Sequence, residues 1–251
     1  KTQLIDSKLA HADETGMRVE GKLQWLHTVS NALWTYLYMH PKRGWEAFES
    51  SESILGRLSQ WLVHDCWSSY FKLEDVFHAL CGAHLLRELQ AQIDQGRKWA
   101  TQMQALLLEL YQQSLQADRP PPDREAILAR FEAICKQADE EEPPPEPSKR
   151  GKPKRTKGRN LFERMQIHRE AVLAFAFHPE VPFTNNQAER DIRPLKLKQK
   201  VAGCFRTSTG AKHFARIQAF ISTTRKHQRN VFKELRAAFA GQTFITLEFG
   251  S

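Results

Sequence analysis

The sequence predicts an α/β domain built on a mixed β-sheet. Three observations support this class: short segments of alternating apolar residues near the N-terminus, helical spacing in the segments that follow, and an expected element order of βββαβαβ. Of the 251 residues, 41% are hydrophobic, which suffices for one sizeable core with an insertion or for two smaller cores.

The first three strands are expected to form an antiparallel meander. The predicted strands cover residues 8–13, residues 17–29, where apolar side chains alternate, and residues 33–40, which are rich in aromatic side chains. Asp13 ends the first strand, and a turn is expected at residues 14–16. His11 lies on the same strand face as Asp13, because strand residues repeat every two positions.

Helix and strand then alternate. Helical spacing over residues 44–59 precedes the apolar segment 61–65, a short strand that stops at Asp65, and residues 77–84 are a fifth strand candidate. Asp13 and Asp65 thus both occupy the C-terminal end of a strand, where sites form in open α/β sheets. The alternative interpretation is that each Asp only opens the turn after its strand.

Residues 85–179 are predicted to be a helical insertion into this α/β domain. Helical patterns cover residues 85–115, 124–138 and 161–177. The tract at about 139–159 is acidic, proline-rich and then basic, a composition typical of a linker. Residues 1–84 and 180–251 are therefore expected to be the two parts of the interrupted domain.

Positive charge concentrates in the last part of the chain. The whole chain carries +8 at pH 7, whereas residues 185–236 alone carry +10, from 13 Lys or Arg and 3 Asp or Glu. Clustered charge of this kind favours nucleic acid as the partner. The candidates for phosphate contacts are the basic residues without an expected core position: Arg190, Arg193, Lys196, Lys198, Lys200, Arg206 and Lys212.

Glu189 lies in a helix start that is polar and then strongly basic. Residues 186–189 fit the capping-box pattern, in which the Glu side chain reaches back to the backbone amide of the cap residue. The other interpretation is a metal ligand that faces a polyanion. Asn185 and Asn186 are expected to shape the helix start, with a DNA contact as the alternative. Pro194 is expected to end or kink this helix within two turns.

Several classes are excluded by cysteine spacing and hydropathy. The four cysteines lie far apart without a CxxC pair, so no zinc ribbon or disulfide framework is indicated, and reduced thiols in a cytoplasm are expected. Cys81 and His84 lack the second ligand pair of a zinc site. No apolar run approaches the roughly 18 residues of a membrane span, and no signal peptide is recognised. Because the chain starts at Lys1, we expect a fragment of a longer protein.

Five segments together resemble a known family: HADETG, LVHDCWSSYF, HALCGAHLLREL, TNNQAERDIRPLK and GCFRTSTGAKHFARIQAFISTTRKHQRNVF. In this order they are similar to the catalytic domain of the insertion sequence 66 family of bacterial transposases, with the weakest likeness in the helical insertion. The resemblance implies a ribonuclease-H-like fold with an interrupting helical insertion and a catalytic Asp, Asp, Glu triad. Carried over motif by motif, the triad is Asp13, Asp65 and Glu189. Cys66 departs from the Gly that is usual after the second Asp.

The activity implied by this resemblance is metal-dependent cleavage and strand transfer of DNA. Two Mg²⁺ or Mn²⁺ ions about 3.5–4 Å apart serve the attacking and leaving oxygens of such a reaction. Asp13 would bridge the ions, with Asp65 on one and Glu189 on the other, and His11 could line the site. The expected partners are transposon ends, target DNA and further copies of the chain in a synaptic complex, with no membrane. The alternatives are a two-metal nuclease without strand transfer and a catalytically inactive DNA-binding fragment.

Overall fold

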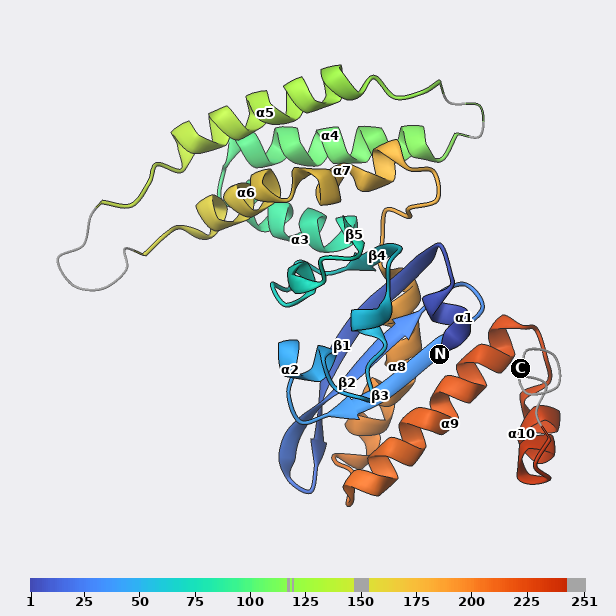
Figure 1. Ribbon diagram of the computed structural model, residues 1–251. Helices are drawn as coiled ribbons and strands as arrows, with labels where there is room; N and C mark the ends of the chain where they lie inside the picture. Colours follow the sequence, from blue (N-terminus) through green and yellow to red (C-terminus); the bar gives the residue numbers. More distant parts are fainter. Residues whose placement is uncertain (117, 119, 147–153, 243–251) are drawn as a thin grey trace. The chain divides into compact units, whose positions relative to one another are not determined.

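The computed structural model describes residues 1–116, 118, 120–146 and 154–242, and Figure 1 shows its helices and strands. The chain divides into two compact units. The first unit combines residues 1–76 with those from 186 onward, and the second unit comprises residues 77–185. None of the helices in these described ranges combines the length and the hydropathy that a membrane span requires.

The sheet is mixed, as the sequence predicts. Strands β1 (Leu9–Val19), β2 (Lys22–Ser30) and β3 (Thr35–His40) form the expected antiparallel meander, and β4 (Trp61–His64) pairs in parallel with β1. The five strands have the order β3-β2-β1-β4-β5, in which β5 (Phe77–Leu80) is counted with the second unit. The predicted α/β class with a mixed sheet is confirmed.

Strand β1 is much longer than predicted. Its ladder with β2 continues to Val19, and the turn lies at Glu20 and Gly21, both with positive φ, as in two-residue hairpins. The expected turn at residues 14–16 is therefore wrong. A Cβ at Gly16 would lie 3.0 Å from the Leu23 side chain and 3.8 Å from the Trp25 ring, so a larger residue would require Leu23 to shift. Pairing with β2 overrides the turn-like composition of these residues.

Between β3 and β4 the structure is mostly irregular. Only the short helices α2 (Trp45–Phe48) and η1 (Leu55–Arg57) form where helical spacing was predicted over residues 44–59. Their apolar side chains are nevertheless buried against one face of the sheet, together with α1 (Thr2–Ile5) and η2 (Tyr70–Lys72). The helical spacing thus predicted correctly which side chains are buried, but the continuous helix that it predicted is wrong.

The opposite sheet face is covered by α8 (Asn186–Ala202) and α9 (Ser208–Lys226), as Figure 1 shows. Met17 and Val19 of β1 share a cluster with Ile192 and Leu195 of α8. Helix α8 passes through Pro194 and continues to Ala202, so of the two expected effects, a helix end or a kink, the helix end is wrong. Burial of apolar residues on both sides of Pro194 stabilises the helix across this position.

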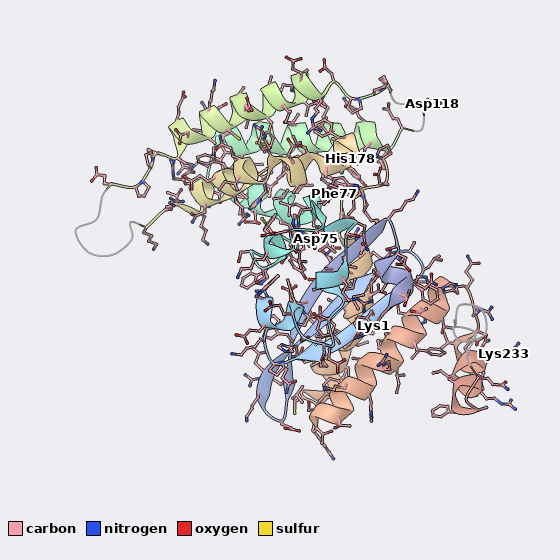
Figure 2. The ribbon with its side chains drawn as sticks, in the orientation of Figure 1. Lys1, Asp75, Phe77, Asp118, His178 and Lys233 are labelled. Carbon is pink, nitrogen blue, oxygen red and sulfur yellow. The ribbon has the colours of Figure 1, made fainter. Side chains whose placement is uncertain are left out.

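The C-terminal helices begin at hydroxyl and amide caps. The Thr207 side chain accepts a hydrogen bond from the Gly210 N–H at 3.0 Å at the start of α9. Asn230 caps α10 (Val231–Phe239) in the same way through the Lys233 N–H at 2.9 Å. The Lys233 side chain projects from α10 (Figure 2).

The second unit is a helical layer. It contains α3 (Gly82–Ile93), α4 (Lys98–Ser114), α5 (Arg124–Glu141), α6 (Lys157–Ile167) and α7 (Arg169–Phe177). The pattern predicted as one helix over residues 85–115 breaks at Gly96, whose φ is +81°, and the pattern over 161–177 breaks at His168. Described ends of the expected linker belong to α5 and α6, and its residues 147–153 lie outside the described part of the chain.

Candidate active site

Asp13 and Asp65 lie at the same level of two neighbouring strands. The parallel ladder ends with His11 paired to Val63. Two residues further along each strand, the same register brings Asp13 level with Asp65, and neighbouring strands lie about 4.8 Å apart. Asp13 is therefore inside β1 rather than at its end, which corrects the prediction. It still lies just beyond the C-terminal end of the parallel pair, where α/β sheets form their sites.

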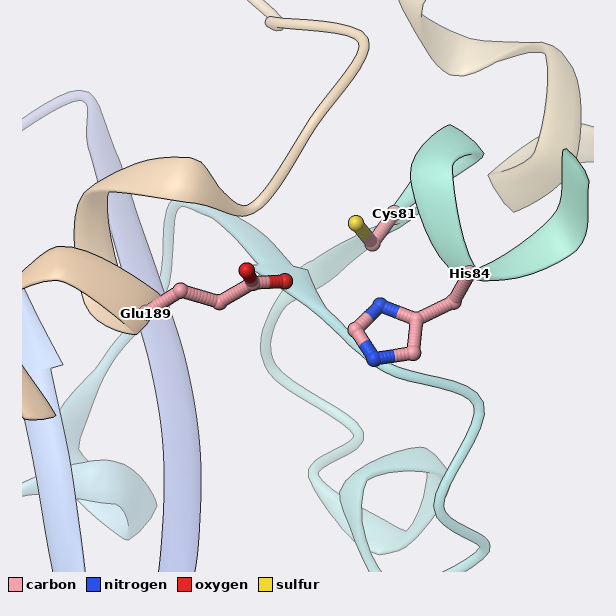
Figure 3. A group of neighbouring side chains, drawn as sticks. All are labelled: Cys81, His84 and Glu189. Carbon is pink, nitrogen blue, oxygen red and sulfur yellow. The ribbon is translucent and has the colours of Figure 1, made fainter. Parts of the chain in front are cut away.

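Asp13 faces the helix that carries Glu189. Alternate residues of a strand point to opposite sheet faces, so Asp13 shares a face with Met17, which packs under α8. Glu189 is in the first turn of α8, and its side chain is drawn in Figure 3. Cys81 and His84, also drawn there, come from the start of α3 in the second unit. The first unit thus brings all three predicted acids to one region.

The electrostatics of Asp13 are unfavourable for a carboxylate. Burial is the largest cause that raises its pKa, from the usual 3.8 to about 7. The charge of Glu14 raises the pKa further, as do the charges of Asp65 and Glu189, while the Glu14 N–H lowers it by donating to Asp13 Oδ1 at 2.8 Å. Ionised Asp13 therefore lacks a sufficient compensating positive charge.

Such a set of donors fits Mg²⁺ or Mn²⁺, which take oxygen ligands and bring positive charge. Asp13, Asp65 and Glu189 are the residues that could hold these ions.

Asp65 directly follows β4, as predicted. Its Oδ1 accepts a hydrogen bond from the Trp67 N–H at 3.0 Å, the local bond of an Asp that opens a turn. The other oxygen, Oδ2, lies 3.9 Å from Nη2 of Arg43. Cys66 is half-buried and follows in the same turn. The turn-forming interpretation therefore accounts for one Asp65 oxygen, whereas the second oxygen lies near Arg43.

Glu14 is a buried acid that the sequence interpretation missed. Its side chain is 1% exposed and accepts hydrogen bonds from Arg43 Nε at 2.8 Å and from the Tyr70 hydroxyl at 2.6 Å. Burial raises the pKa of Glu14 and the Asp65 charge raises it further, whereas Tyr70 and Arg43 lower it. The only sequence signal was the period of two, which puts Glu14 opposite Asp13 once β1 is extended.

Arg43 connects Glu14 with Asp65. Its guanidinium carbon lies 3.8 Å from the centre of the Trp67 ring and 5.0 Å from that of Trp25. Cation–π contacts of this kind hold a guanidinium in one orientation. No local motif marks Arg43, because its acidic partners lie far from it in the sequence.

The residues expected to line the site have different positions. His11 is 6% exposed, two residues before Asp13 and on the same face of β1. Asn186 is the first residue of α8 and is exposed. Asn185 is buried at the end of the second unit, where its N–H donates to Cys81 Sγ at 3.2 Å.

Most of the predicted phosphate contacts are on the surface of the first unit. The exposed side chains among them are Arg190, Arg193, Lys196, Lys200, Arg206 and Lys212. Lys198 is half-buried, with its ammonium 3.9 Å from the centre of the Phe205 ring. The segment between α8 and α9 is fixed to the end of β1, because the Phe205 N–H donates to the Arg18 carbonyl at 2.9 Å.

A buried ion pair that the sequence interpretation missed joins α8 to α9. Lys226 Nζ lies 2.8 Å from Asp191 Oδ2, and both side chains are nearly inaccessible. Lys226 also donates to the carbonyl of Asn31 at 2.9 Å and to Thr35 Oγ1 at 2.6 Å. The pair therefore ties both helices to the strands beneath them, and it fixes the helix from which Glu189 projects.

Comparison with known proteins adds independent information. The protein-family model described as "Transposase IS66 family" matches residues 1–213. The matched range includes Asp13, Asp65, Glu189 and every predicted phosphate contact. No curated protein matches this chain.

Proposed function

Because this chain belongs to the IS66 family of transposases, we propose that its first unit is a DDE-type catalytic domain that cleaves and joins DNA strands. We further propose that this domain is ribonuclease-H-like and that the helical second unit is its insertion. The observation that carries the proposal is the placement of Asp13 level with Asp65, on the sheet face covered by the helix of Glu189. The raised pKa of Asp13 supports a site that is completed by cations.

The three acids would act as ligands. Together, Asp13, Asp65 and Glu189 would hold the Mg²⁺ or Mn²⁺ ions that the reaction needs. When bound, such ions activate the attacking oxygen and stabilise the leaving oxygen of an in-line displacement. The Trp67 N–H and the Glu14 N–H each hold one carboxylate oxygen in place, at 3.0 and 2.8 Å.

The basic residues would hold the DNA backbone. Arg193 lies four residues after Glu189 and therefore on the same face of α8, which is suited to a phosphate beside the reacting one. Water would attack in the first cleavage, and a DNA 3′-hydroxyl would attack in strand transfer. In each case the new P–O bond forms as the P–O bond to the leaving oxygen breaks, without a covalent enzyme intermediate.

Nicking and joining of short duplex DNA with Mn²⁺ tests this proposal. Wild type is expected to be active, and Asp13→Asn, Asp65→Asn and Glu189→Gln to lose at least about 10³-fold, because each removes a ligand oxygen. DNA binding in EDTA should persist in all three, since it depends on Lys and Arg. Joined products distinguish strand transfer from plain hydrolysis. Full activity in any folded variant would exclude that residue from the triad.

A further inference from the structure

A pocket of about 410 Å³ lies between α8 and α9 in the first unit, beside the candidate active site but with its own lining. Charged and polar side chains from both helices define it: Gln187, Arg190 and Asp191 of α8, and Ser222, Arg225 and Lys226 of α9. The helices are fixed relative to one another here by the buried Asp191–Lys226 pair.

The negative charge in this pocket is already compensated. Asp191 is 5% exposed, and its oxygens accept from Lys226 at 2.8 Å, from the Ser222 hydroxyl at 2.6 Å and from the Gln187 amide at 3.1 Å. A carboxylate with these three donors does not need a further cation. The charges of Arg190 and Arg225 are therefore left for another partner.

Both guanidinium groups are exposed at this pocket. Among the described residues, neither Arg190 nor Arg225 forms an ion pair, and Arg190 donates only to the neutral Gln187 Oε1 at 3.1 Å. Burial lowers the pKa of Lys226 most, Asp191 raises it, and the Arg190 charge lowers it again. The pocket is thus positively charged, and the guanidinium groups of Arg190 and Arg225 lie at its surface without an ion-pair partner among the described residues.

We propose that this pocket binds a backbone phosphate of the DNA, with Arg190 and Arg225 as its ligands. A guanidinium presents parallel N–H groups that match phosphate oxygens. The side-chain amide of Gln187 is a further polar group in the pocket lining. The inference rests on the proposed function, because it names where the DNA substrate is held. It adds Arg225, which lies outside the predicted set of contacts.

The position of the pocket suits the backbone of a strand rather than a free anion. Arg190 follows Glu189 by one residue, a rise of about 1.5 Å along α8. Its side chain points to a neighbouring face of the helix, about 100° away. A strand whose reacting phosphate lies at Glu189 would therefore bring a neighbouring phosphate to Arg190 and Arg225.

The test is binding of labelled duplex DNA in EDTA, measured by anisotropy between about 50 and 200 mM salt. Arg225→Gln should weaken binding about five- to tenfold at 0.1 M salt and reduce the slope of log affinity against log salt by about 0.9, the value for one phosphate contact. Arg225→Lys should keep the slope, since it keeps the charge. Lys233→Gln on α10 is the matched control, with the same charge change outside the pocket, and should stay near wild type.

Arg190→Gln gives a second, independent variant, and circular dichroism should show both variants folded. Wild-type affinity and slope in folded Arg225→Gln and Arg190→Gln would overturn the proposal, and wild-type cleavage would then still support the proposed function. Binding of inorganic phosphate that depends on Arg225, with DNA binding unaffected, would overturn the assignment to DNA. A wild-type chain that binds no DNA would contradict the inference and the proposed function together.

Discussion

The adjacent acids Asp13 and Glu14 point to opposite faces of β1 and differ in whether a cation of the protein pairs with them. Glu14 points to the face with η2, where Arg43 and Tyr70 donate to its carboxylate. Asp13 points to the face under α8, and burial together with the charges of Glu14, Asp65 and Glu189 raises its pKa to about 7. Within the described residues, no ion pair forms with Asp13. Glu14, the structural acid, is thus paired with Arg43 of the protein itself, whereas Asp13, the candidate ligand, would be paired with a bound metal cation.

The largest expected effect on stability comes from the structural acid. Glu14→Gln should lower the free energy of unfolding by about 3 kcal/mol, because the buried carboxylate accepts from both Arg43 and Tyr70, whereas an amide has one acceptor oxygen, so one of these hydrogen bonds is lost. Chemical denaturation of wild type and variant measures this difference. A loss below about 0.5 kcal/mol would remove the contrast between the two faces.

Asp13→Asn should raise the free energy of unfolding rather than lower it. The native state of the wild type holds the extra proton between pH 3.8 and about 7, so the Asp13 contribution falls as pH rises through that window. At pH 8 the Asn variant should therefore be more stable than wild type, on the order of 2 kcal/mol, and the gain should disappear near pH 4. Denaturation curves at both pH values, without divalent ions, check this; a variant less stable than wild type at pH 8 would contradict it.

The smallest effect expected is that of Tyr70→Phe. Removing the hydroxyl takes one hydrogen bond from a buried carboxylate while the ring stays packed against His64, so we expect a loss of about 1–2 kcal/mol. Combining Tyr70→Phe with Glu14→Gln should cost less than the sum of the two single losses, since both act on one bond. Additive losses would show that the hydroxyl stabilises the fold in another way.

Much of the scaffold could be predicted from the sequence, because it depends on local pattern. Alternation identified the meander, and the apolar segment before Asp65 identified β4. The length of β1 could not be predicted, because residues 14–16 have a turn-like composition and become extended only through their pairing with β2. Pro194 misled the prediction for α8 in a similar way, since packing on the sheet stabilises the helix beyond it.

The candidate site was only partly accessible to sequence reasoning. Asp13, Asp65 and Glu189 stand in short motifs that can be matched one by one. Arg43 has no motif, and its contact with Glu14 joins residues separated by 29 positions. The pairing of Asp191 with Lys226 spans 35 positions. Contacts of this kind follow from the folded topology, so a single sequence does not contain a local signal for them.

The most direct test of the contrast between the two faces is calorimetric titration of Mn²⁺ into wild type, Asp13→Asn and Glu14→Gln, each shown to be folded. We expect saturable binding by wild type and by Glu14→Gln, and its loss in Asp13→Asn, because Asp13 points to the face of Glu189 and Glu14 does not. Binding by Asp13→Asn equal to that of wild type, or equal loss in both variants, would contradict it.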